Sequence, residues 1–123
     1  MSKKVAVIGA SRDPKKYSHK AVKAFQMNGY DVFPVNPNAA TIAGRACYPA
    51  FTDIPEHVDE VTVYLPPDKT IQFLDELADY ELEHLYLNPG SADYEVKKKA
   101  EDMGLPVIQA CSIVAQGYNP DSL

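Results

Sequence analysis

The pattern of apolar residues at the start of the chain predicts a buried strand and then an amphipathic helix. Residues 5–8 form a continuous, mostly β-branched apolar run, which is typical of a strand covered on both faces of a parallel sheet. Apolar side chains then recur at the spacing of a helix, at Tyr17, Ala21, Ala24 and Phe25. Gly29 follows as a helix stop, because glycine readily takes the left-handed conformation found there. We therefore expect a central strand followed by one helix.

The alternation of strand and helix patterns continues to the end of the chain. Apolar runs predict further strands at residues 31–35, 59–65, 84–87 and 106–109, and a short one near 46–48. Apolar stripes predict two more helices, one with Ile71, Leu74, Leu77 and Ala78 and the other with Val96, Ala100 and Met103. Asp68 and Ser91 are the expected N-caps of these helices, and Gly104 is the expected end of the second one.

Strands that alternate with helices predict right-handed crossovers and a parallel sheet with helices on both faces. A chain of 123 residues, 46% of them hydrophobic, has the size of one domain. We therefore predict an α/β fold: a single Rossmann-like domain over residues 1–123, with a doubly wound parallel sheet of about five strands. Pro34 has no amide hydrogen, so the strand at 31–35 is not expected to be paired along both sides.

Charge and composition narrow the classes of partner. A formal net charge of −5 argues against nucleic-acid binding, which depends on a positive field. No apolar stretch is long enough to span a bilayer and no cleavable signal precedes the first strand, so we expect a cytoplasmic protein with no membrane partner. Cys47 and Cys111 match no metal-ligating or redox spacing, so we expect free thiols and no metal site.

Positive charge is concentrated in one segment of this acidic chain. The segment contains a single acid, Asp13, and five cations: Arg12, Lys15, Lys16, Lys20 and Lys23. A local cationic site for an anion and a solvated helix face both fit this pattern.

Small, turn-forming residues follow the predicted strands. Ligands of doubly wound sheets bind beyond the carboxyl ends of the strands, so these positions form the candidate site. They are Gly9, Ala10, Ser11 and Arg12, then Asn36 and Pro37, Pro66 and Pro67, Asn88, Pro89 and Gly90, and finally Cys111 and Ser112. Gly9 permits a sharp turn and close approach of a ligand, Ser11 offers a hydroxyl, and the first amides of the next helix favour phosphate. The first turn is therefore a candidate phosphate-binding loop, although a tight turn alone would also use glycine.

Two familiar nucleotide motifs are not matched. The dinucleotide fingerprint G-x-G-x-x-G has Gly9, Ser11 and Pro14 at its glycine positions here, and Asn36 stands where an acid would hold the ribose. These differences disfavour NAD. The Walker pattern of P-loop NTPases is also absent from the sequence.

Residues 5–14, followed by Lys16, closely resemble the opening of CoA-binding Rossmann domains. Such domains occur in ADP-forming acyl-CoA synthetases, in the alpha subunit of succinyl-CoA synthetase and in small stand-alone CoA-binding proteins. The resemblance continues along most of the chain, through residues 29–37, Ile42-Ala43-Gly44, Tyr48, Asp53-Ile54-Pro55 and Val58-Asp59.

The resemblance implies a role for each candidate segment. Residues 9–12 with Lys16 correspond to the loop that cradles the CoA diphosphate, where nearby cations would offset the phosphate charge. Asn36 and Pro37 correspond to the nucleotide end, and Tyr17 at the first helical turn is a candidate contact or a core residue. The remaining segments correspond to the pantetheine arm and its thiol end: Pro66 and Pro67, Asn88 to Gly90, and Cys111 with Ser112.

We therefore expect a ligand-binding or regulatory module for CoA or an acyl-CoA. The alternatives are an NAD(P)-type oxidoreductase and an interaction domain that has lost its ligand. No catalytic residue is predicted, because His19, His57 and His84 have no nucleophile or acid at triad spacing. Ligase activity is not expected, since 123 residues have no room for the other synthetase domains. Cys111 is either a packing residue or a thiol able to form a mixed disulfide with CoA, and a protein partner and the oligomeric state are left open.

Overall fold

The computed structural model describes residues 2–123 and contains a parallel sheet of five strands in the order β2-β1-β5-β6-β7. The strands are β1 (Lys4–Ile8), β2 (Asp31–Val35), β5 (Glu60–Val63), β6 (His84–Leu87) and β7 (Val107–Ile108). The apolar run in β1 is explained by its central place, because β1 pairs with β2 on one side and with β5 on the other. The predicted single-domain Rossmann-like fold is confirmed.

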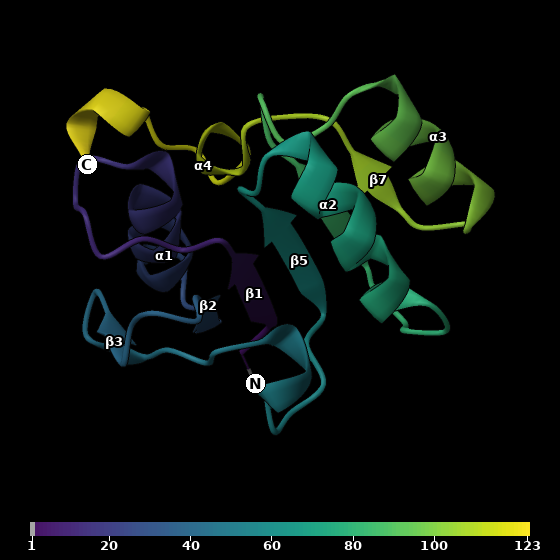
Figure 1. The fold of residues 1–123 in the computed structure, drawn as a ribbon. Coiled ribbons are helices and arrows are strands. Elements are labelled where there is room, and N and C mark those ends of the chain that lie inside the picture. Colours follow the sequence, from purple (N-terminus) through teal and green to yellow (C-terminus); the bar gives the residue numbers. More distant parts are fainter. Residues whose placement is uncertain (1) are drawn as a thin grey trace.

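Helices cover both faces of this sheet (Figure 1). On one face, α1 (Tyr17–Met27) and α4 (Ser112–Ala115) bury Phe25 and Ile113 against Val5 and Val7 of β1. On the other face lie α2 (Pro67–Phe73), its continuation η2 (Leu74–Leu77) and α3 (Tyr94–Asp102). Each strand residue thus faces one of two apolar layers according to its place in the alternation of the strand.

The connection from β2 to β5 carries no full helix. It contains an antiparallel hairpin, β3 (Thr41–Ile42) and β4 (Arg45–Ala46), and the short η1 (Phe51–Asp53). The strand predicted near 46–48 is therefore only partly right: β4 ends at Ala46, and Tyr48 forms an isolated bridge with Val35. A last short turn of helix, η3 (Pro120–Ser122), ends the chain.

The N-caps predicted for two helices are wrong. Asp93 caps α3 by accepting a hydrogen bond from the Val96 amide at 3.0 Å, whereas the Ser91 hydroxyl donates to the Asn88 carbonyl oxygen. Asp68 lies inside the first turn of α2, whose N-cap is Pro66. A side chain two residues from the expected cap can take the same role, which spacing alone does not resolve.

Other expectations from the pattern are confirmed. Gly29 and Gly104 follow the ends of their helices with φ of +83° and +73°, the left-handed conformation. Pro34 lies in β2, an edge strand of the sheet. Tyr17, in contrast, is 55% exposed and does not belong to the core stripe of α1. Among the helices of residues 2–123, none has both the length and the apolarity needed to cross a bilayer.

Candidate functional site

The strand order reverses between β1 and β5, and the loops that follow these strands touch each other there. Gly9 has φ of +81°, and a Cβ at this position would lie 3.0 Å from Leu65 Cδ2 and 3.3 Å from the Tyr64 carbonyl oxygen. A larger residue would therefore push the two loops apart as well as strain the turn. The first reason for Gly9 is thus the contact between loops at the switch point, where doubly wound sheets place their ligands.

Hydrogen bonds to the end of β2 and to α1 hold the β1–α1 loop (residues 9–16) in place. The Gly9 and Ala10 amides both donate to the Val35 carbonyl oxygen, at 3.1 and 3.2 Å. Asn36 Nδ2 donates to the Ala10 carbonyl oxygen at 2.7 Å, and His19 Nδ1 donates to the Ser11 carbonyl oxygen at 2.8 Å. His19 is thus a structural residue, and bonds within the protein fix the base of the loop.

The β1–α1 loop and the first turn of α1 also contain backbone amides that are free to donate hydrogen bonds. Ser11 Oγ accepts the Asp13 amide at 3.0 Å, and Asp13 Oδ1 accepts the Lys15 amide at 2.9 Å. Within residues 2–123, the amides of Ser11, Arg12, Tyr17 and Ser18 have no hydrogen-bond acceptor. α1 also has no acidic residue in its first turn and no side-chain cap, so the positive end of its dipole is open.

The cations of this region are available to a ligand. Arg12, Lys15 and Lys16 are exposed, and none of them forms an ion pair with any other described residue. Lys20 is engaged instead, since its Nζ donates to the Pro120 carbonyl oxygen at 2.8 Å. The loop therefore combines free backbone amides with unpaired positive side chains, the groups that commonly bind phosphate in proteins.

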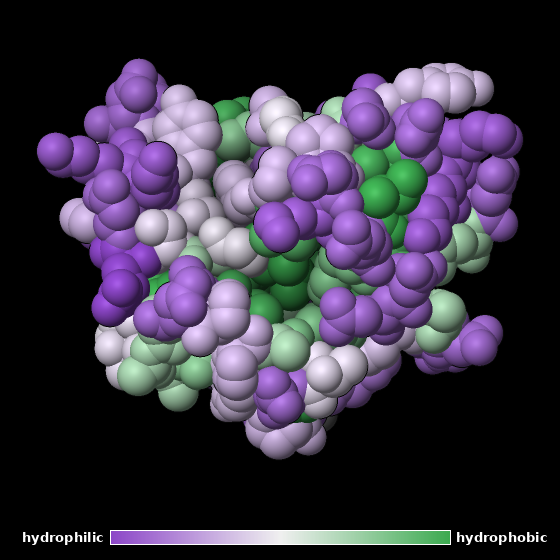
Figure 2. All heavy atoms as spheres, in the orientation of Figure 1, coloured by the Kyte–Doolittle hydropathy of each residue, from purple (hydrophilic) through white to green (hydrophobic). Residues whose placement is uncertain are grey.

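One hollow, of about 450 Å³, opens beside the loop between η1 and α2, and we call it the η1–α2 hollow. The β2–β5 connection places the short η1 beside this hollow, and Phe51 of η1 lines it. Figure 2 shows apolar atoms recessed near the centre of this face, with polar side chains around them. The lining residues are Ile8, Gly9, Val35, Asn36, Pro37, Pro49, Ala50, Phe51, Leu65, Lys69, Gln72, Phe73 and Glu76.

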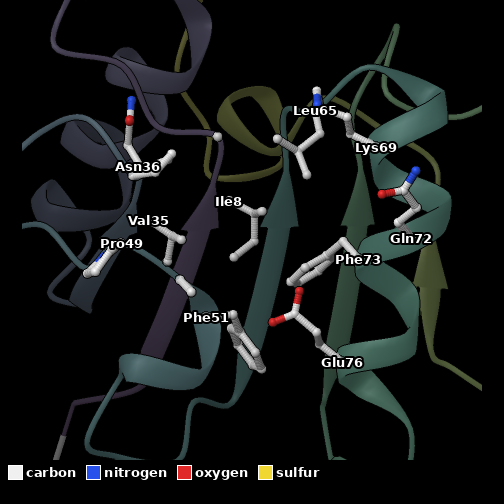
Figure 3. Close-up of a pocket in the computed structure, with 13 residues that line it drawn as sticks. Ile8, Val35, Asn36, Pro49, Phe51, Leu65, Lys69, Gln72, Phe73 and Glu76 are labelled. Carbon is white, nitrogen blue, oxygen red and sulfur yellow. The ribbon is translucent and has the colours of Figure 1, made fainter.

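The η1–α2 hollow has an apolar floor and a polar wall (Figure 3). The rings of Phe51 and Phe73 meet edge to face, with centroids 5.6 Å apart. Lys69, Gln72 and Glu76 line the side formed by α2 and η2. Partial burial raises the pKa of the Glu76 carboxyl. This shape suits a flat, largely apolar group with a few polar atoms on its edge.

A second hollow, of about 360 Å³, lies where α1 begins against the end of β5, and we call it the α1–β5 hollow. Lys15, Lys16, Tyr17, Ser18 and Tyr64 line it. Tyr64 is the lining residue that comes from the sheet side. The two hollows therefore lie on opposite faces of the sheet, the η1–α2 hollow on the face of α2 and the α1–β5 hollow on the face of α1.

A buried polar network, the carboxyl-end network, lies next to Tyr64 and contains Thr62, Asn88 and Ser112 with it. Asn88 Nδ2 donates to Thr62 Oγ1 at 2.7 Å, and Asn88 Oδ1 accepts the Ser112 amide at 2.8 Å. Thr62 Oγ1 donates to Ser112 Oγ at 2.8 Å, and Ser112 Oγ lies 3.1 Å from Tyr64 Oη. Asn88 and Ser112 are 2% and 0% exposed, so their side chains lie beneath the surface of the candidate site.

The structure brings some of the predicted site residues together and leaves others apart. Gly9, Asn36 and Pro37 line the η1–α2 hollow, and Lys16 and Tyr17 line the α1–β5 hollow. The predicted residues that line neither hollow are Ala10, Ser11 and Arg12 of the β1–α1 loop, Asn88 and Ser112 of the carboxyl-end network, and Pro66, Pro67, Pro89, Gly90 and Cys111. Cys111 is a half-buried free thiol at the N-cap of α4.

Sequence reasoning missed Tyr64, Lys69 and the aromatic floor of the η1–α2 hollow. A signal was present for Tyr64, because Glu60, Thr62 and Tyr64 alternate along one strand and so share one face. Lys69 and Gln72 follow the β5 strand on the helix that begins there, which also places them near the same edge.

The chain is similar to a known protein family and to several known proteins. A family model described as a CoA binding domain matches residues 3–117. The ADP-forming acetate-CoA ligase II of Archaeoglobus fulgidus is 35% identical over 101 residues, 80% of this chain and 15% of the ligase. The uncharacterized protein YneT of Bacillus subtilis is 27% identical over 107 residues, 87% of this chain and 79% of YneT. The chain thus spans a small part of the ligase and most of YneT.

The fold also occurs among solved structures. A conserved hypothetical protein from Pyrococcus furiosus matches with a TM-score of 0.81 and 30% identity, covering 92% of this chain and 98% of that one. The resemblance to CoA-binding domains that rests on residues 5–14 and 29–37 is confirmed, since the family model extends over both segments. The chain therefore belongs to the CoA-binding domain family.

Proposed function

We propose that this protein binds CoA or an acyl-CoA across the carboxyl edge of its sheet, with the diphosphate on the β1–α1 loop. The observation that carries the proposal is the pairing of unused amides at Ser11, Arg12, Tyr17 and Ser18 with unpaired cations beside them. Several free donors at the open end of a helix dipole suit a group with delocalised negative charge.

The two hollows supply places for the two arms of such a ligand. The nucleotide end would occupy the η1–α2 hollow, where Asn36 and Pro37 lie at the rim and Phe51 and Phe73 form the floor. The pantetheine arm would run through the α1–β5 hollow toward Cys111. In this arrangement Pro66, Pro67 and residues 88–90 support the path of the arm, and Asn88 and Ser112 hold its wall.

An NAD-dependent reaction finds less support. Asn36 stands where an acid would hold a ribose, and its Nδ2 already donates to the Ala10 carbonyl oxygen. An oxidoreductase and an interaction domain without a ligand are therefore kept as outcomes of the experiment. A role as a regulatory module or as a partner of another protein would depend on this binding.

A thermal-shift series with CoA, acetyl-CoA, ADP and NAD tests the proposal. Saturation at 100 times the dissociation constant stabilises a protein by about 2.7 kcal/mol, or roughly 10 °C for a domain of this size. We expect large shifts with CoA and acetyl-CoA, a smaller one with ADP, and little with NAD. A shift with NAD alone would favour the oxidoreductase. No shift with any of them, in protein shown by mass spectrometry to carry no ligand, would favour the interaction domain.

A matched pair of variants tests the phosphate seat itself. Arg12→Glu combined with Lys16→Glu is expected to lower CoA affinity by about tenfold or more, because both cations lie at the loop. Lys97→Glu combined with Lys98→Glu changes the net charge equally, on α3. Equal losses in the two double variants would show general charge attraction and contradict a defined phosphate site.

A further inference from the structure

The hydrogen bonds of the carboxyl-end network run in one direction. Asn88 Nδ2 can only donate, and it donates to Thr62 Oγ1 at 2.7 Å. Thr62 Oγ1 in turn donates its proton to Ser112 Oγ at 2.8 Å. The chain of donors that starts at Asn88 therefore reaches Ser112 with each proton directed toward the next oxygen.

The direction of the Ser112 hydroxyl proton determines whether Tyr64 accepts or donates in the bond between the two side chains. Ser112 is fully buried, so its hydroxyl proton needs an acceptor inside the protein. Thr62 Oγ1 already directs its own proton at Ser112, which leaves Tyr64 Oη, 3.1 Å away, as the acceptor among residues 2–123. Ser112 therefore donates to Tyr64, and the Tyr64 proton is left without a partner in the network.

Tyr64 is placed to offer that proton to a ligand. It lines the α1–β5 hollow, together with Lys15, Lys16, Tyr17 and Ser18. Burial raises the pKa of the phenol, so the hydroxyl stays a donor throughout the physiological range. Ser112, the residue that Tyr64 contacts, directly follows Cys111.

We propose that the Tyr64 hydroxyl donates a hydrogen bond to the carbonyl oxygen of an acyl thioester, so that the site prefers acyl-CoA to free CoA. This inference rests on the proposed function. The diphosphate would lie at the loop end of the α1–β5 hollow, and Tyr64 is the lining residue on the sheet side, next to α4. In the proposed arrangement the group that reaches Tyr64 is the far end of the pantetheine arm, because Tyr64 contacts Ser112, the residue after Cys111. A neutral donor suits a thioester carbonyl, which accepts hydrogen bonds, better than it suits a thiol.

Calorimetry with CoA, acetyl-CoA and adenosine 3′,5′-bisphosphate on the full chain tests the proposal. A reductant is included so that Cys111 cannot form a mixed disulfide. Tyr64→Phe keeps the ring and removes only the hydroxyl, and Tyr94→Phe on the exposed side of α3 is the control. We expect Tyr64→Phe to weaken acetyl-CoA about three- to tenfold, the size of one hydrogen bond, and to change CoA and the bisphosphate less than about twofold.

The outcomes separate this inference from the proposed function. If the unaltered protein binds none of the three compounds, the proposed function fails. If it binds acetyl-CoA and Tyr64→Phe weakens acetyl-CoA and CoA equally, or neither, the function stands and the thioester contact is refuted.

A spectroscopic measurement makes the test independent of affinity. Acetyl-CoA labelled with ¹³C at its carbonyl should show a lower carbonyl stretching frequency when bound to the unaltered protein. Part of that shift should disappear in Tyr64→Phe, provided that the variant melts as a folded protein. An unchanged carbonyl frequency in the two proteins would overturn the proposal.

Discussion

The two ends of β5 carry polar networks of opposite character on the same face of the sheet. At the amino end, Glu60 is 1% exposed and accepts hydrogen bonds from Tyr30 Oη at 3.1 Å and His84 Nδ1 at 3.2 Å. Lys3 Nζ lies 3.8 Å from the same carboxylate. This amino-end network (Lys3, Tyr30, Glu60, His84) contains a buried ionisable group whose partners all belong to the protein.

The carboxyl-end network contains no charged group, and its Tyr64 hydroxyl is the donor that we propose for a ligand. A buried carboxylate must be paired, because an unpaired one costs several kcal/mol of unfolding free energy. Neutral hydroxyls and amides leave more freedom, so one of them can remain open to a ligand. Both networks therefore stabilise the fold, but the amino-end network is closed within the protein, whereas the carboxyl-end network holds the Tyr64 hydroxyl that we propose for a ligand.

The largest effect is expected from Asn88→Ala. The substitution leaves the Ser112 amide and the Val63 carbonyl oxygen buried without their partner. We expect the free energy of unfolding to fall by about 3 kcal/mol, measured by urea denaturation. Asn38→Ala, at an exposed position, is the control and should stay within about 0.5 kcal/mol. A loss of under about 1 kcal/mol for Asn88→Ala would mean that water replaces the amide and that the network is open to solvent.

Glu60→Ala is expected to cost about 2 kcal/mol, less than a fully buried pair, because His84 and Lys3 are half-exposed and can return to water. CoA affinity should be unchanged, since the site lies at the other end of the strand. Glu83→Ala is a matched control, because Glu83 also approaches Lys3 but is half-exposed. A change in CoA affinity for Glu60→Ala would break the separation between the two ends.

Tyr30→Phe removes one bond to Glu60 and should cost about 1 kcal/mol near neutral pH. Burial, and then the charge of Glu60, raise the pKa of Tyr30 above its ordinary value of 10.0. Because the folded pKa is raised, this stabilisation is present below the unfolded value and is lost as the pH rises beyond it. The unaltered protein and Tyr30→Phe should therefore converge in unfolding free energy above pH 10. A constant gap across this range would contradict the raised pKa.

The smallest effect concerns Glu76, a carboxylate that lines the η1–α2 hollow and forms no ion pair with the other described residues. Burial raises its pKa from 4.5, so its contribution to stability is complete below that value and declines as the pH rises through the folded pKa. Glu76→Gln should remove this decline, with a gain of a few tenths of a kcal/mol near pH 7, since solvent screens the group. Glu101→Gln on exposed α3 serves as the control in the same pH series. A relative loss for Glu76→Gln would show that a partner, rather than burial, governs this carboxylate.

The elements of the fold were predictable because their signals are local. The β-branched run of β1, the stripe of α1 and the glycine after it depend on residues that are neighbours along the chain. The bounds were less accurate: the strand expected at 59–65 is formed by Glu60–Val63, and the one at 106–109 by Val107–Ile108. The ends of strands depend on the length of their neighbours, which a local pattern does not contain.

The candidate site was predictable in part. Its place at the carboxyl ends follows from the parallel sheet, and the β1–α1 loop follows from Gly9 and the cations after it. Asn88 and Ser112 are residue types common in exposed turns, yet both side chains are buried: Asn88 Oδ1 accepts the Ser112 amide, and Ser112 Oγ accepts from Thr62 Oγ1. Polar residues of this kind can face either way, and the choice depends on a partner 24 residues distant.

The main strands and helices, the turn at Gly9 and the resemblance to the family follow from the amino-acid sequence alone, since each rests on residue types at short spacing. The free amides, the positions of the hollows and the partners within the carboxyl-end network became known only from the folded chain. These properties depend on groups that come from different strands, and hydrogen-bond donors can be counted as free only when all of their neighbours are in place.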